Sequence, residues 1–217
     1  YIIKILFCII VSTILVDKIT YFSLVKISNQ VLSGESIGKL NQFLQIKDKV
    51  EFLIFGSSRA RNHISPQLIS NSSFNMGMGG THIAYANTLI KLLSDKEQLI
   101  LIHIDPHHAF DKKYSANDIN RLKIKYNQNK IIKSEIDKIS SNVLNKIYWS
   151  LDYNGKVLGI LKNYFIPSYN HYNFFGYVAL NQRPEVELSK LMNNSLKECD
   201  RKFILNNYYE KYLKDLK

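Results

Sequence analysis

The feature that most constrains this chain is an alternation of three short apolar runs with segments of helical periodicity. The apolar runs are residues 50–55 (VEFLIF), 73–76 (SFNM) and 98–105 (QLILIHID), and glycine or proline follows each of them. Helical signals lie between them, at residues 65–69 and 81–94. Since successive β-α-β units form parallel sheets with helices over the faces, the sequence predicts an α/β fold.

Polar or glycine-rich segments follow all three predicted strands. They comprise residues 56–61 (GSSRAR), 77–82 (GMGGTH) and 105–108 (DPHH). The carboxyl ends of parallel strands meet at one edge of the sheet, where ligands bind, so we expect these segments to converge there. Ser58 follows a strand and a glycine, as an accessible nucleophile would, and the glycine loop ends at a helix N-terminus that favours an oxyanion. These features are together typical of acyl transfer.

The same segments resemble the SGNH, or GDSL-like, hydrolases and acyltransferases, in particular the membrane-anchored bacterial branches that modify envelope polysaccharides. In that family a Gly-Asp-Ser block follows the first strand, and residues 56–58 (GSS) are similar to its Gly-Ser-Ser variant. The second block, Asn-x-Gly-x-x-Gly, matches residues 75–80 (NMGMGG). The resemblance covers about residues 50–110 and implies a flavodoxin-like, three-layer α/β/α fold with a parallel sheet.

The resemblance also implies roles for individual residues. Ser58 corresponds to the nucleophile, and Gly80 corresponds to a glycine that supplies an N–H to the oxyanion hole. Asn75 and Gly77 correspond to residues that shape the loop around that hole.

Three further side chains beside these blocks are candidates for binding substrate. Arg59 and Arg61 follow the serine, and guanidinium groups pair well with anions, although exposed arginines are also common on surfaces. His82 follows the glycine loop. We expect no cofactor, because His82 takes the place of the last glycine in a dinucleotide-binding pattern. We expect no metal either, because the paired His107 and His108 lack a surrounding cluster of carboxylates.

Two blocks of the family pattern lack a match. Residues 103–108 (HIDPHH) stand where the family has Gly-x-Asn-Asp, and no histidine follows residue 181 to complete a C-terminal Asp-x-x-His. Three interpretations stay open: the chain stops before that block, His107 or His108 substitutes as the base, or the protein is catalytically inactive. Catalysis requires a base within hydrogen-bond reach of Ser58.

Residues 1–25 are predicted to be a membrane anchor or signal segment. The first 16 residues are apolar apart from Lys4 and two hydroxyl residues, whereas a spanning helix needs roughly 20 apolar residues. An uncleaved anchor fits best, because no small-x-small cleavage site follows. A cleaved signal peptide and a buried first helix are the alternatives. Residues 26–49 are predicted to be a connector with a short amphipathic helix.

The predicted α/β domain covers residues 50–217 and includes a lid-like insertion at about residues 111–181. The insertion is first rich in Lys and Asn and then in aromatic residues, so a solvated helix followed by a long loop is the alternative. Residues 189–217 have helical periodicity and no strand after them. We therefore expect the domain to be incomplete at its C-terminus.

The net charge of +11 suits an anionic partner, but the basic residues are dispersed rather than striped, and the predicted anchor argues against nucleic acid. The 2 cysteines allow neither a disulfide framework nor a cysteine-based zinc site. The sequence therefore predicts a membrane-anchored serine esterase or O-acyltransferase, outside the cytoplasm, acting on an acylated or anionic envelope glycan. The alternative is an inactive SGNH-like protein that binds glycans or assists their assembly.

Overall fold

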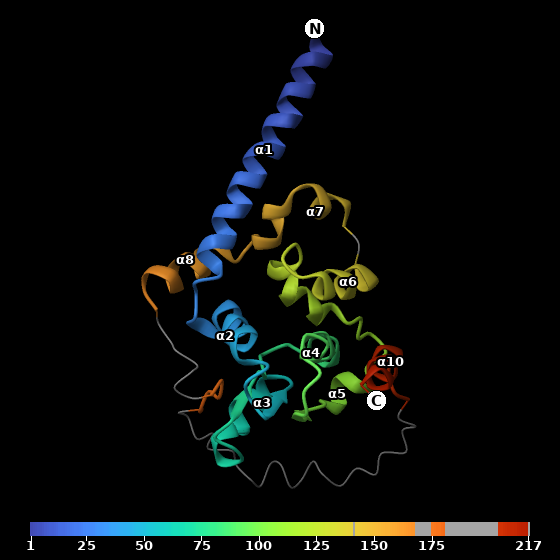
Figure 1. The fold of residues 1–217 in the computed structure, drawn as a ribbon. Helices are drawn as coiled ribbons and strands as arrows, with labels where there is room; N and C mark the ends of the chain where they lie inside the picture. The colour runs from blue at the N-terminus through green and yellow to red at the C-terminus, as the bar shows by residue number, and fades with distance from the viewer. Residues whose placement is uncertain (141, 168–174, 181–203, 217) are drawn as a thin grey trace, which may run out of the picture.

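A three-stranded parallel sheet organises a mostly helical chain. The computed structural model, drawn in Figure 1, describes residues 1–140, 142–167, 175–180 and 204–216. Strands β1 (Phe52–Phe55), β2 (Ser73–Asn75) and β3 (Leu99–Ile102) lie in the order β2-β1-β3. The central strand β1 pairs in parallel with both neighbours. The predicted α/β class with a parallel sheet is confirmed.

The third strand is covered on one face only among the described residues. The run 98–105 is apolar enough for both faces to be covered, yet Leu99 is 66% exposed and Leu101 is 40% exposed. Ile100 and Ile102, on the opposite face, pack against the core. β3 lies at one edge of the sheet within the described residues, and only one of its faces is covered there.

The segment after β1, which the sequence suggests is a loop, is the short helix α3 (Ser58–His63). Ser57 caps this helix, because its hydroxyl oxygen accepts the N–H of Arg59. The helix covers one face of β1, where Ala60 packs with Phe52 and Ile54. The helix predicted at residues 65–69 is only the 3-10 turn η2 (Pro66–Leu68).

The other face of the sheet is covered by the main core. Helix α4 (Ile83–Ile90) follows β2 as predicted and is buried along nearly its whole length. Helix α10 (Asn207–Asp215) packs against α4 through the buried Tyr209 and Tyr212. α10 belongs to the predicted C-terminal helical region, of which residues 189–203 lie outside the described residues.

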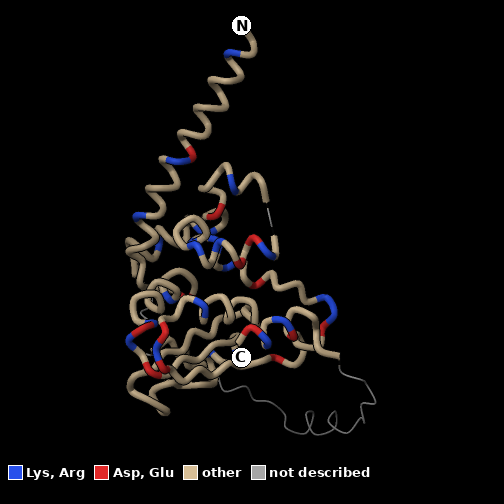
Figure 2. Tube along the Cα trace, turned by 45° about the vertical axis from the view of Figure 1, so that its right-hand side comes forward, with Lys and Arg blue, Asp and Glu red and all other residues tan. Residues whose placement is uncertain are grey.

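Helix α1 (Ile2–Ser28) projects away from the rest of the molecule (Figures 1 and 2). Its first sixteen residues are almost all exposed. Its last part packs against the 3-10 helix η4 (Trp149–Tyr153), where the carboxylate of Asp17 accepts the backbone N–H groups of Trp149 and Ser150. Within the part of the chain that the structure describes, none of the helices combines the length and the apolar character that a membrane crossing requires.

The connector turns back from α1 towards the sheet. It contains the π-helical turn η1 (Gly34–Gly38) and helix α2 (Lys39–Ile46), which lies where the sequence predicts a short helix. The buried Asn41 amide donates to the carbonyls of Ser28 and Val31, which fixes α2 against the end of α1.

The region expected to be a lid-like insertion is largely helical. Its elements are the 3-10 helix η3 (Asn117–Lys125), α6 (Lys130–Ile139), α7 (Val143–Ile147), η4 and α8 (Val157–Phe165), and the short helix α5 (Pro106–Ala109) precedes them. Buried isoleucine and leucine side chains of η3 and α6 belong to the main core beside α4. The first half of this region is therefore part of the core rather than a separate cap.

Candidate functional site

The serine block (residues 56–58) and the glycine loop (residues 77–80) lie together at the carboxyl ends of β1 and β2. The carbonyl of Gly56 accepts the backbone N–H of Met78 at 3.0 Å and the Thr81 hydroxyl at 2.9 Å. A Cβ atom added to Gly79 would be 3.9 Å from the Ser58 Cβ. Two segments that are separate in the sequence therefore form one surface around Ser58.

Ser58 is the first residue of α3 and is partly exposed. The turn before it depends on Gly56, whose φ of 147° lies in the region that favours glycine and whose missing Cβ would be 2.8 Å from the His103 Cβ. The Ser58 hydroxyl has no hydrogen-bond partner among the described residues. The residue is partly exposed, and no described side chain accepts the proton of its hydroxyl.

Asn75 connects α3 with the glycine loop through hydrogen bonds of its side chain. Its buried side-chain amide donates to the carbonyls of Ala60 and Ile64, both at 2.8 Å, and its oxygen accepts the N–H of Gly77 at 2.8 Å. The loop is closely packed here, because a Cβ on Gly77 would be 2.7 Å from the backbone nitrogen of Arg61. Asn75 and Gly77 therefore shape the loop, and the Gly77 N–H is not free to bind an oxyanion.

Three backbone N–H groups of the serine block and the glycine loop have no acceptor among the described residues. They belong to Ser58, Gly79 and Gly80. The first is an unsatisfied donor of the first turn of α3, and the other two lie in the glycine loop. Such donors beside a serine are the groups that stabilise a tetrahedral oxyanion.

Both arginines after the serine are engaged within the protein. The Arg59 Nη1 lies 3.1 Å from a carboxylate oxygen of Asp105, and Arg61 forms an ion pair with Glu35 of η1. Although burial opposes it, the backbone N–H of His107 and the Arg59 charge hold the pKa of Asp105 below its ordinary value. The two guanidinium groups thus have internal counter-ions.

The three candidate histidines form a small cluster at the same edge of the sheet. The ring centroid of His82, the residue before α4, lies 3.9 Å from that of His108, and the ring centroids of His107 and His108 are 5.2 Å apart. Burial and the neighbouring His108 lower the pKa of His82. Among the described residues, none of these rings forms a hydrogen bond with Ser58. The described part of the chain therefore lacks a formed nucleophile–base pair.

Lys39 also contacts the glycine loop, although no motif in the sequence indicates it. Its side chain is fully buried under the glycine loop, where its ammonium donates to the carbonyls of Gly77 and Gly176. Burial and the charge of Arg61 lower the pKa of Lys39 to about 7, while Glu35 opposes this shift. A lysine in an amphipathic segment resembles any surface lysine, so no local pattern could have revealed it.

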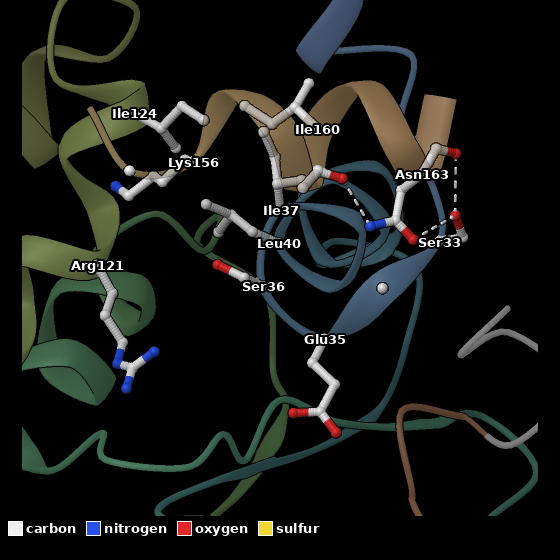
Figure 3. Close-up of a pocket in the computed structure, with 13 residues that line it drawn as sticks. Ser33, Glu35, Ser36, Ile37, Leu40, Arg121, Ile124, Lys156, Ile160 and Asn163 are labelled. Atoms are coloured by element: carbon white, nitrogen blue, oxygen red, sulfur yellow. Dashed lines mark hydrogen bonds between the residues drawn. The ribbon is translucent and has the colours of Figure 1, made fainter. Parts of the chain in front are cut away.

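A cavity of about 320 Å³ lies beside this site, between the connector and α8 (Figure 3). It is lined by Ser33, Gly34, Glu35, Ser36, Ile37, Leu40, Arg121, Ile124, Gly155, Lys156, Gly159, Ile160 and Asn163. Arg121 links the cavity to the glycine loop, because a Cβ on Gly80 would be 2.9 Å from an Arg121 nitrogen. The insertion thus contributes an arginine beside the loop that carries Gly80.

The described residues contain no group of three or more His, Cys, Asp or Glu side chains that could hold a metal ion. A comparison of the chain with protein-family models, curated proteins and solved structures finds no match. Function therefore has to be inferred from the residues of the site themselves.

Proposed function

We propose that the protein is a membrane-attached serine esterase or O-acyltransferase of the SGNH type that acts on a cell-envelope polysaccharide. The observation that carries this proposal is the approach of Ser58 to Gly79, together with the backbone N–H groups of Ser58, Gly79 and Gly80 that have no acceptor among the described residues. A nucleophile and oxyanion donors at one sheet edge are the two parts that ester cleavage needs first.

The sheet is compatible with the flavodoxin-like fold that the resemblance implies. Its order, β2-β1-β3, corresponds to the first three strands of the flavodoxin order 2-1-3-4-5. The Asn-x-Gly-x-x-Gly block begins at the last residue of β2. Its asparagine donates two hydrogen bonds to α3 and the residue after it, and accepts one from the loop. These features support an SGNH-type domain.

In the proposed reaction, the Ser58 oxygen attacks the carbonyl carbon of an ester, and a histidine base takes the hydroxyl proton. The backbone N–H groups of Ser58, Gly79 and Gly80 hold the oxygen of the tetrahedral intermediate. Collapse of that intermediate expels the alcohol, which receives the proton, and leaves an acyl group on the serine. Water or a second hydroxyl group then accepts the acyl group. His107 and His108 are the candidate bases within the chain.

Membrane attachment through α1, with the domain outside the cytoplasm as in the envelope proteins that the sequence resembles, is the second part of the proposal. The projecting part of α1 exposes large apolar side chains along its length, including Ile2, Phe7, Ile10 and Val16. A soluble protein seldom exposes a large continuous apolar surface unless something covers it. The hydrocarbon of a membrane is the proposed cover.

Covalent labelling tests the enzymatic proposal. A fluorophosphonate should label the full chain in mild detergent, and Ser58→Ala should abolish the label. Ser65→Ala is the matched control, because Ser65 precedes η2 without capping it and should keep full labelling. Absence of labelling in a folded wild-type chain would exclude a reactive serine.

A catalytically inactive SGNH-like protein that binds glycans or assists their assembly is the second candidate. It is favoured by one observation, the absence of any described base on the Ser58 hydroxyl. In that case the chain should bind saccharides with the same affinity before and after Ser58→Ala, and the fluorophosphonate should not react.

A further inference from the structure

The cavity beside the glycine loop brings together two cations from different elements. Arg121 comes from η3 and Lys156 immediately precedes α8, and Figure 3 shows both on the same side of the cavity. Neither side chain forms a hydrogen bond or an ion pair with a described residue. Burial lowers the pKa of Lys156, Asp152 opposes that shift, and the charges of Lys123 and Arg121 add to it. The two cations therefore repel each other.

The carboxylates around the cavity are already engaged. Glu35 lines the cavity, but it pairs with Arg61. Asp152 accepts hydrogen bonds from two asparagine side chains and lies outside ion-pair distance of Lys156. Neither cation therefore has a carboxylate within ion-pair distance among the described residues, although Asp152 attracts Lys156 from further away. A bound anion would offset the repulsion between the two cations.

The remaining walls of the cavity favour a compact organic group over a hydrated ion. Four aliphatic side chains, Ile37, Leu40, Ile124 and Ile160, line it together with the polar groups. The volume of about 320 Å³ lies at the lower end of the range of small-molecule sites, which is about 300–1,000 Å³. A single unit of a larger molecule would fit such a space.

Two consecutive glycines connect Arg121, which lines the cavity, with the proposed nucleophile. Gly79 approaches Ser58, and Gly80 approaches the Arg121 guanidinium. Adjacent Cα atoms are only about 3.8 Å apart, so the two contacts lie one residue apart along the glycine loop.

We propose that this cavity binds a carboxylate or phosphate group of the substrate through Arg121 and Lys156 while the ester bond of the same substrate lies at Ser58. This inference rests on the proposed function, which it makes more specific. It narrows the substrate to an O-acylated glycan that carries a negative charge close to its acyl group.

Binding measurements on the full chain in mild detergent test this site. The probes are an oligomer of galacturonic acid for the carboxylate, an oligomer of glycerol phosphate for the phosphate, and a neutral glucose oligomer. At least one charged oligomer should bind at least tenfold more tightly than the neutral one, and added salt should weaken that binding. The charged oligomer that binds more tightly identifies the anion.

Variants then locate the site. Arg121→Gln and Lys156→Gln should each weaken binding of the charged oligomer roughly tenfold, since each removes a charge-assisted contact. Lys162→Gln is the matched control, because Lys162 lies on α8 but does not line the cavity, and its affinity should be unchanged. Thermal unfolding checks that all variants remain folded.

The outcomes separate this inference from the enzymatic proposal. Unchanged affinity in a folded Arg121→Gln, Lys156→Gln double variant, or equal binding of neutral and charged oligomers, overturns the cavity site even when Ser58 is labelled. Conversely, charge-dependent binding that both cavity substitutions weaken supports the site even when Ser58 does not react, and then only the enzymatic proposal fails.

Discussion

Protonation of the buried Lys39 should make the protein less stable at pH 6 than at pH 9. The pKa of this amine falls from 10.5 to about 7, chiefly because burial disfavours the charged form. Between these two values the unfolded chain binds more protons than the folded one, so the free energy of unfolding rises with pH. Linkage for this single proton gives an increase of about 2 to 3 kcal/mol between pH 6 and pH 9.

Urea unfolding of the wild-type chain and of Lys39→Met at several pH values measures this effect. The variant also loses the hydrogen bonds to Gly77 and Gly176, but it loses them at every pH at which it is folded. At each pH, the unfolding free energy of the variant is therefore subtracted from that of the wild type. The informative quantity is how this difference changes with pH. In Lys39→Met, the part of the increase in unfolding free energy between pH 6 and pH 9 that Lys39 causes should disappear.

Lys49→Met provides the control, because Lys49 follows α2 closely in the sequence but is exposed. The unfolding free energy of Lys49→Met should depend on pH as that of the wild type does, because Lys39 and other titrating groups such as Lys125 are unchanged. A difference between wild type and Lys39→Met that stays constant from pH 6 to pH 9 would refute the reasoning. In that case the ammonium of Lys39 would keep its ordinary pKa in the folded protein.

Two further predictions concern the glycine loop and α1. Asn75→Ala removes three buried hydrogen bonds, so it should lower the free energy of unfolding by about 2 to 4 kcal/mol in urea titrations and abolish Ser58 labelling. A loss below 1 kcal/mol with full labelling would contradict the role of Asn75. For α1, the chain should float with lipid vesicles, and the double substitution Phe7→Asp, Ile10→Asp should reduce flotation strongly. Ile69→Asp, at an equally exposed isoleucine of the body, should not, and equal flotation of all three proteins would argue against attachment through α1.

The strands and α4 were predictable because their signals are local. β1 and β2 lie inside the apolar runs at residues 50–55 and 73–76, and a glycine follows within two residues of each strand. The burial of β3 was not predictable in the same way. An apolar run indicates a strand, but the number of covered faces depends on which other elements pack there, and the face with Leu99 and Leu101 stays exposed among the described residues.

The site was predictable only where it consists of short sequence blocks. Ser58 and the glycine loop stand out in the sequence because glycines and a serine directly follow strands. Lys39 and Arg121 reach the loop only through tertiary packing, since Lys39 is 38 positions from the carbonyl that it binds. Arg59 and Arg61 have the residue type that substrate binding requires, yet their ion pairs depend on Asp105 and Glu35, which lie elsewhere in the sequence.

The continuity of α1 has a consequence for where the protein can work. The projecting residues 2–16 make an arm about 22 Å long at the helical rise per residue. The same helix continues without a break to Ser28, and Asp17 and Asn41 tie its base to the body. If the tip is embedded, the site stands at a fixed height above the surface instead of sweeping freely on a tether. The proposed reaction would then be confined to polymer segments that pass within that layer.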